Sequence, residues 1–162
     1  MLDFVKKNKV CDLYSAVNGQ LINLCDVPDP AFSSGMMGPG VAYILEDHMI
    51  YSPCDGELIM FFPTKHAFGL RMNNGAEILI HIGLNTVEAQ GKGFKQLAAV
   101  GTKNKKGDPI VEVDVELLQS LGYSLKTPMI ITNAQNYFIE ERMLDDSLIT
   151  TDDLLYSLKR KK

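Results

Sequence analysis

Short apolar runs alternate with turn-forming residues along most of the chain. The runs span four or five residues and are separated by Gly, Asn, Asp or Pro, as in β-strands joined by tight turns. Closely spaced short strands are typical of sandwiches and barrels. We therefore predict an all-β fold, an antiparallel β-sandwich or barrel with a few short helices. The clearest predicted strands are residues 41–45, 68–72, 78–82, 110–113 and 129–132.

Three segments carry helix signals. Asp114 can cap a run over 116–121 that ends at Gly122. A second helix is expected after Asn133, through residues 137–139. Thr151, followed by two aspartates and two leucines, resembles a capping box and predicts a short helix near the C-terminus.

The length of 162 residues fits one domain with a sizeable core. We expect residues 1–12 to be a flexible N-terminal tail, residues 13–143 to form a single domain, and residues 144–162 to be a C-terminal extension that includes the short helix. An internal echo, YSAVNGQLINL from Tyr14 and YSPCDGELIMF from Tyr51, repeats a strand-turn-strand unit. The echo favours a fold built by internal duplication.

Two histidines flank an Asn-Asn-Gly turn between two predicted strands, and the loop length decides how they pair. With a loop of Asn73 and Asn74, His66 lies directly opposite His81. With the loop shifted by one residue, the two rings are diagonal neighbours on the same face. Only a three-residue loop sends them to opposite faces. Two of the three registers therefore bring the rings together.

A pair of neutral imidazoles on one face can divide two tasks. One ring attacks phosphorus and holds the phosphoryl group, while the other donates a hydrogen bond to its oxygens. Both rings could instead bind Zn²⁺, although two ligands are too few for a structural site and no His-x-x-x-His or Cys-x-x-Cys spacing supplies more. A third alternative is that both are ordinary strand residues. Spacing alone leaves the two rings equivalent.

Neighbouring residues favour the phosphoryl site. Gly83 has no side chain, so a partner backbone could approach His81 closely. Three isoleucines alternate with His81 and predict a stiff face behind it. Thr64 lies two residues before His66, hence on the same face of the strand, where its hydroxyl can accept from an imidazole N–H.

Charge and cysteine content exclude several classes of protein. The net charge of −4 and the pI near 5.3 argue against nucleic acid as the main partner. Three cysteines without metal-like spacing make a disulfide framework unexpected, so we expect a cytoplasmic protein. We also expect no membrane span and no signal peptide, because no 18-residue apolar stretch is present.

Two segments resemble a known family over residues 13–133. The run GAEILIHIGLNTV around His81 is similar to the signature of the phosphorylated histidine in the glucose-type IIA component of the bacterial sugar phosphotransferase system, and TKHAF around His66 resembles that family's other active-site segment. The resemblance implies a phosphotransferase in which His81 accepts the phosphoryl group, His66 supports it and Thr64 orients His66 by a hydrogen bond.

The resemblance further implies a cytoplasmic phosphocarrier that takes phosphate from the phosphohistidine of the carrier HPr and passes it to a cysteine of a sugar-specific IIB domain. No cofactor is required, although the pair of His66 and His81 could bind an accessory zinc ion. A regulatory module that inhibits transporters or enzymes through the same face is the alternative. A metal-assisted hydrolase using Glu77 is disfavoured because no third ligand is identifiable.

A docking face is expected around the histidine pair. The resemblance implies that this face combines a carboxylate, Asp29, with apolar residues arranged around the histidines. The methionines among them would adapt to partners of different shape. Asn85 stands where the family usually has aspartate, and the lost charge is expected to weaken steering of a basic partner. The expected apolar residues are Phe32, Met36, Met37, Phe62, Leu79 and Val87.

Overall fold

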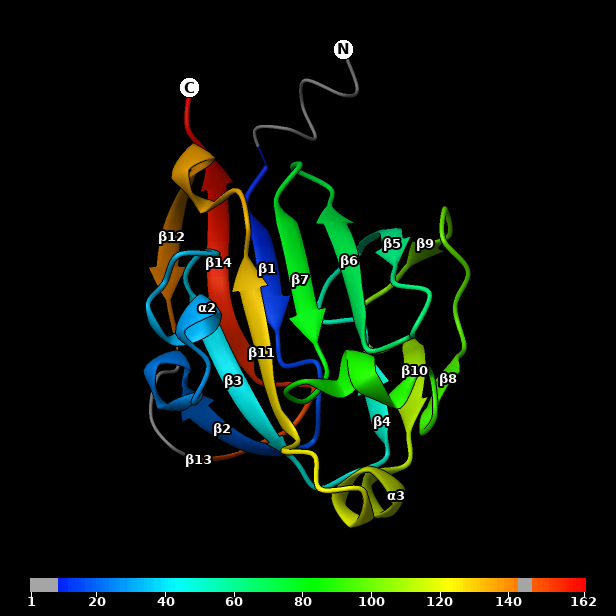
Figure 1. Ribbon diagram of the computed structural model, residues 1–162. Coiled ribbons are helices and arrows are strands. Elements are labelled where there is room, and N and C mark those ends of the chain that lie inside the picture. Colours follow the sequence, from blue (N-terminus) through cyan, green and yellow to red (C-terminus); the bar gives the residue numbers. More distant parts are fainter. Residues whose placement is uncertain (1–8, 143–146) are drawn as a thin grey trace.

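An eight-stranded antiparallel sheet forms one layer of the computed structural model, which describes residues 9–142 and 147–162. In spatial order its strands are β13 (Ser147–Ile149), β2 (Gly19–Asn23), β3 (Gly40–Leu45), β11 (Lys126–Ile131), β7 (Glu77–His81), β6 (Ala67–Met72), β5 (Gly56–Phe61) and β9 (Lys103–Asn104). Figure 1 shows β3, β11, β7 and β6 side by side at the front.

Two three-stranded sheets complete the fold, and the main core cluster lies between them and the large sheet. This cluster joins Ile78 and Ile80 of β7 to Leu158 and Ile110 of the smaller sheets, each at most 1% exposed. The predicted all-β antiparallel sandwich is confirmed. One small sheet contains β1 (Cys11–Tyr14), β14 (Leu154–Arg160) and β12 (Tyr137–Glu141), and the other contains β4 (Met49–Tyr51), β10 (Pro109–Val113) and β8 (Phe94–Gln96).

Helical segments among the described residues are short. The predicted helix at Asp114 is confirmed: its carboxylate accepts from the Leu117 N–H at 3.1 Å, and Gly122, with φ +89°, follows the helix end. The sequence pattern did not indicate α2, which lies near the start of β3 (Figure 1) and packs through Phe32 against Ala42 of β3 and Ile130 of β11. The segments are η1 (Leu24–Asp26), α2 (Pro30–Ser33), η2 (Thr86–Ala89), α3 (Val115–Ser120) and η3 (Ala134–Asn136).

Of the other two predicted helices, the one after Asn133 is confirmed only as the short 3₁₀ helix η3 (Ala134–Asn136), and the C-terminal one is wrong. Residues 137–139 belong to β12, and the C-terminal residues form β13 and β14. The apparent capping box closes a turn instead, in which the Thr150 N–H donates to the Asp153 carboxylate at 2.8 Å. Leu155 and Leu158 are fully buried in β14, so tertiary burial overrides the local helix signal.

The C-terminal strand is part of the domain, not an extension of it. β14 lies between β1 and β12 in its sheet, and Cys11 and Asp12 pair with Leu158 and Ser157. Part of the expected N-terminal tail is therefore a strand, while residues 1–8 and 143–146 lie outside the described residues. The two ends of the chain complete one sheet together.

The internal echo corresponds to a structural repeat. Each copy leaves a small sheet and enters the large one, from β1 to β2 and from β4 to β5. The Tyr14 N–H donates to the Pro53 carbonyl, and the Tyr51 N–H donates to the Ala16 carbonyl, both at 2.8 Å. The two copies of the repeat therefore bond each other reciprocally, through equivalent backbone atoms.

A three-residue loop, Asn73 to Gly75, joins β6 to β7. Gly75 has φ +90° and its N–H donates to the Met72 carbonyl at 2.9 Å, as in hairpins that place glycine after a tight turn. Asn74 is fully buried, and its side-chain amide donates to the Leu158 carbonyl of β14 at 2.9 Å. This long-range anchor favours the three-residue loop over the two shorter registers.

Replacing Asn74 by Ala is expected to lower the free energy of unfolding by about 2 kcal/mol, because the buried Leu158 carbonyl loses its donor. Urea denaturation measures the change. The matched control is Asn73→Ala in the same loop, whose exposed side chain is expected to contribute less than about 0.5 kcal/mol. Equal losses in the two variants would contradict the anchoring role of Asn74.

Candidate active site

His81 is the last residue of β7, and small residues on β6 leave space for its ring. Ala67 pairs directly with His81, and the next residue of β6 on that face is Gly69. No large side chain of β6 therefore competes with the imidazole. The predicted isoleucine face behind the ring is confirmed by the burial of Ile78, Ile80 and Ile82.

His66 lies just before β6, outside the strand. The Ile82 N–H donates to the His66 carbonyl at 2.6 Å, so His66 lies opposite Ile82. If the regular pairing of β6 and β7 continued to this point, the His66 side chain would lie on the same buried face of the sheet as Ile82. Lys65, the residue before His66, has a left-handed φ of +62°, so the backbone leaves the extended conformation at this point. The two ring centroids are 5.0 Å apart with an interplanar angle of 78°. The rings are thus paired in the register that was expected to separate them.

Each imidazole also contacts a phenylalanine. Phe32 of α2 lies 5.2 Å from the His81 ring, and Phe62 lies 5.2 Å from the His66 ring. Phe32 is only 4% exposed and belongs to a second, smaller apolar cluster beneath α2. The expectation that Phe32 offers docking surface is therefore wrong, since its side chain supports His81. No sequence spacing indicates this contact between distant segments.

Gly83 holds the His81 ring. Nδ1 of His81 lies 2.7 Å from the Gly83 carbonyl, which only accepts, so Nδ1 carries the proton and Nε2 of the neutral ring carries the lone pair. Gly83 is buried with φ +73°, and a Cβ atom there would lie 2.7 Å from the Ser124 carbonyl oxygen. The expectation that Gly83 leaves room for a partner backbone is wrong, because the chain's own backbone occupies that space.

Thr64 lies in the turn between β5 and β6 rather than on a strand. Its Oγ1 atom is nevertheless 2.6 Å from Nδ1 of His66. Because a hydroxyl can donate or accept, this nitrogen can carry a proton or not, unlike Nδ1 of His81. His66 is only 3% exposed, whereas His81 is half-buried. The two residues therefore differ in solvent exposure, and they differ in whether the hydrogen-bond partner determines which ring nitrogen carries the proton.

Burial lowers the pKa of both imidazoles. For His66, burial is the larger cause and the neighbouring His81 the smaller one. For His81, burial also lowers the pKa, while the hydrogen bond to Gly83 and the charge of Asp29 oppose it. Both rings are therefore neutral near pH 7, and each keeps one nitrogen lone pair.

The lowered pKa values predict how stability depends on pH. Both folded-state pKa values lie below the ordinary value of 6.5, so the unfolded chain binds more protons once the pH falls below 6.5. His66 and His81 should remove no stability above this pH and progressively more below it. Imidazole titration by NMR should give midpoints below 6.5 for both rings. Midpoints at or above 6.5 would contradict their neutrality in the fold.

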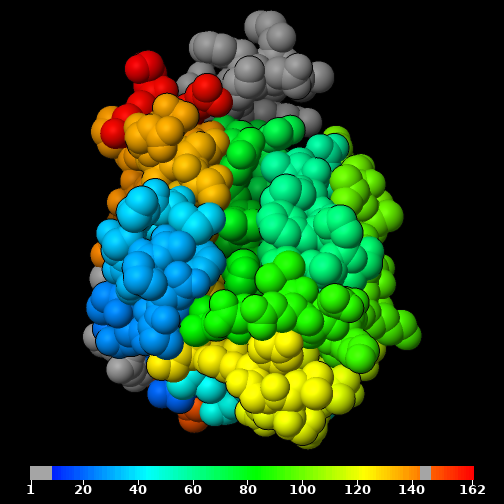
Figure 2. Space-filling model, viewed as in Figure 1, coloured from blue at the N-terminus to red at the C-terminus, as the bar shows by residue number. Residues whose placement is uncertain are grey.

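Residues expected on the docking face differ in exposure. Met36 is 84% exposed, Val87 49% and Met37 38%, whereas Phe62 and Leu79 are half-buried. Figure 2 shows this face, with a blue segment on the left and a blue-green segment on the right of a recessed green strip. The exposed methionines and Val87 thus supply apolar surface on segments that flank the histidines.

Two polar residues of the expected docking face have structural roles. Asp29 is half-buried and caps α2, where Oδ1 accepts from the Ala31 N–H at 3.0 Å. Asn85 is exposed with φ +58°, a left-handed conformation that asparagine tolerates better than most residues. Asn85 therefore suits the turn between β7 and η2.

Metal and disulfide chemistry receive no support in the described part of the chain. Among residues 9–142 and 147–162, no group of three or more His, Cys, Asp or Glu side chains is arranged to hold a metal ion, so an accessory zinc ion at His66 and His81 gains no third ligand. The three cysteines are free in the structure. Within the same residues, no helix is long and apolar enough to cross a membrane.

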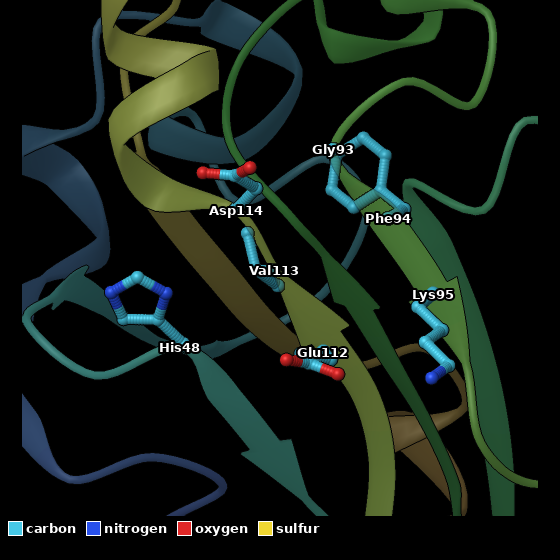
Figure 3. A pocket seen from close by; sticks show the side chains of 7 residues that line it. All are labelled: His48, Gly93, Phe94, Lys95, Glu112, Val113 and Asp114. Atoms are coloured by element: carbon cyan, nitrogen blue, oxygen red, sulfur yellow. The ribbon is translucent and has the colours of Figure 1, made fainter.

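A separate hollow of about 540 Å³ contains the third histidine (Figure 3). His48 Nε2 lies 3.1 Å from Glu116 Oε1 of α3, at the surface. No residue of the histidine pair lines this hollow, so it is distinct from the candidate active site. Its lining residues are His48, Gly93, Phe94, Lys95, Glu112, Val113 and Asp114.

Comparison with known proteins agrees with the all-β fold. Residues 11–137 match the family model described as phosphoenolpyruvate-dependent sugar phosphotransferase system, EIIA 1. A glucose-specific EIIA component of Halalkalibacterium halodurans is 42% identical over 130 residues, which are 80% of this chain and 75% of that protein. An N-acetylglucosamine-specific EIICBA component of Klebsiella pneumoniae is 37% identical over 149 residues, which are 92% of this chain but 23% of that protein.

A solved structure has the same architecture. Glucose permease IIA from Mycoplasma capricolum matches with a TM-score of 0.84 and 33% identity, covering 93% of this chain and 96% of that chain. The agreement of sequence and fold shows the family: this chain belongs to the EIIA 1 family of the phosphoenolpyruvate-dependent sugar phosphotransferase system.

Proposed function

We propose that His81 is the residue of this phosphotransferase component that accepts the phosphoryl group. As a member of the EIIA family, the protein takes phosphate from HPr and passes it to a IIB domain. The observation that carries the assignment is the 2.7 Å contact between His81 Nδ1 and the Gly83 carbonyl. It leaves the lone pair on Nε2, and His81 is the more exposed of the two rings.

In the first step, Nε2 of His81 attacks phosphorus in line with the nitrogen that holds the phosphoryl group on HPr. The new N–P bond forms as the old one breaks, and its electron pair stays on the HPr histidine. No proton leaves His81, because Nδ1–H remains bonded to Gly83. That bond also stabilises the positive charge that phosphorylation brings to the ring.

His66 is proposed to donate a hydrogen bond to the phosphoryl oxygens. Its pKa lies below the ordinary value, so the ring is neutral and donates through one nitrogen only. For Nε2 to be that donor, Nδ1 must accept, and the Thr64 hydroxyl must therefore donate across the 2.6 Å contact, the reverse of the direction expected from the sequence. Thr64 thereby determines which nitrogen of His66 faces the phosphate.

In the second step, a thiolate of the IIB domain attacks phosphorus. The sulfur–phosphorus bond forms as the N–P bond breaks, and the electron pair returns to Nε2 of His81. No cofactor takes part in either step. The exposed Met36 and Val87 are proposed to contact both partners, and a partner is expected to supply most of the positive charge around the phosphoryl group.

The proposed location is the cytoplasm, where HPr and IIB domains exchange phosphate. Its support is the family assignment together with three free cysteines, one of which, Cys54, is buried with its pKa raised to about 12 by burial. Such thiols fit a reducing compartment.

Incubation with labelled phosphoenolpyruvate, the first enzyme of the relay and HPr tests the proposal. The protein should gain label that is lost in acid and kept in base, as expected for a phosphohistidine, and peptide mapping should place it on His81. A protein that gains no label, or gains label stable in acid, would overturn the proposed function.

A further inference from the structure

Lys65 directly precedes His66 in the turn between β5 and β6, and its backbone conformation is unfavourable for lysine. Its φ of +62° is left-handed, a region that costs energy for residues with a Cβ atom and that glycine usually occupies. Among the described non-glycine residues, only Asn85 and Gln90 share it. Surrounding contacts must therefore hold Lys65 in place.

Both the backbone and the side chain of Lys65 are held. Its N–H donates to the Phe62 carbonyl at 2.8 Å, and its ammonium donates to Gln96 Oε1 at 2.5 Å and lies 5.6 Å from the centre of the Phe61 ring. Gln96 Nε2 donates to the Ala98 carbonyl at 2.8 Å. Since an ammonium only donates and a carbonyl only accepts, these two contacts determine the orientation of the Gln96 amide.

We propose that Lys65 and Gln96 are positioning residues for His66: the contact between Nζ and Oε1 holds Lys65 in its left-handed conformation and thereby keeps the His66 ring against His81. Gln96 lies in β8, in a different sheet from β5 and β6 (Figure 1). The contact thus ties the loop that carries His66 to a second sheet. The inference rests on the proposed function of His66.

A double-mutant cycle separates this role from general stabilisation. Gln96→Ala should lower kcat for phosphoryl transfer to a IIB domain about tenfold, with little change in KM, because Lys65 then leaves its left-handed conformation. Lys65→Val should lower kcat at least as much, since a β-branched residue disfavours this conformation most. Lys65→Gly should keep kcat within about threefold, because glycine adopts positive φ without an anchor.

The decisive comparison is Gln96→Ala in the Lys65→Gly background. There it should have no further effect, because glycine does not need Gln96. The same tenfold loss in both backgrounds would overturn the proposal, because Gln96 would then act by another route. A loss in Lys65→Gly as large as in Lys65→Val would also overturn it, because the ammonium rather than the conformation would then matter.

Imidazole titration keeps this test separate from the proposed function. In Gln96→Ala the titration midpoint of His66 should move upward, because the ring leaves its buried place beside His81. An unchanged His66 midpoint would overturn the positioning role. Failure of the wild-type protein to gain label would overturn the proposed function alone, since the titration does not depend on phosphate.

Discussion

Replacement of His81 by Gln is expected to abolish phosphoryl acceptance from HPr, with a loss of more than about a thousandfold. Glutamine approximates the size and polarity of the imidazole, but its amide nitrogen has no lone pair free to attack phosphorus. His66 is not expected to replace the missing nucleophile, because the residue is only 3% exposed. Label from phosphoenolpyruvate, measured after a fixed time with HPr in excess, gives the result directly.

The matched control for this variant is His48→Gln. His48 is an exposed histidine that contacts Glu116 and lines the separate hollow, so the variant should gain label as the wild type does. An unchanged unfolding midpoint in both variants shows that the fold is retained. If His81→Gln still accepted phosphate at the wild-type rate, the nucleophile would be another residue.

The second large effect is expected for His66→Gln, which should still accept phosphate on His81 but pass it to a IIB domain about a hundredfold more slowly. Transition-state stabilisation by one hydrogen-bond donor typically contributes this much in a site that excludes water. Acceptance should suffer less, because the nucleophile and its Gly83 anchor are unchanged. Single-turnover transfer from the prelabelled protein to a IIB domain measures the effect.

Thr64 variants separate orientation from general disturbance in this experiment. Thr64→Val keeps the shape of the side chain but removes the hydroxyl that contacts His66 at 2.6 Å, so it should reproduce part of the transfer defect. Thr64→Ser retains the hydroxyl and should restore transfer. If His66→Gln abolished acceptance while His81→Gln did not, the proposed roles of the two rings would be reversed.

Local sequence patterns correctly predicted the elements that are stabilised by neighbouring residues, and the side chains that alternate toward the main core. The helix at Asp114 follows from its own capping residue, and the isoleucines around His81 follow from strict alternation. Local patterns failed where distant segments decide the outcome. The C-terminal capping signal was overridden because Leu155 and Leu158 are buried against the rest of the fold. Asn74 likewise sets a loop length through its bond to β14.

The residues of the candidate site could be predicted from the sequence, but their geometry could not. Both histidines and Thr64 lie in segments that carry the family pattern, so their identity required no coordinates. Strand alternation, however, predicted separate faces for the rings in the register that the structure has. His66 lies outside β6 and follows the left-handed Lys65, and no periodicity in the sequence encodes a single backbone angle.

The sequence by itself determined the all-β class, the internal repeat and the two histidines, because strand periodicity, turn residues and motif identity are properties of neighbouring residues. Only the tertiary structure decided that the C-terminal strand completes the domain, that Phe32 is buried beside His81, and which nitrogen of His81 carries the lone pair. The physical reason is that each of these depends on contacts between residues far apart in the sequence or on the exact backbone path. The C-terminal strand is buried between β1 and β12, Phe32 reaches His81 from another segment, and the Gly83 carbonyl is held where it accepts from Nδ1 of His81.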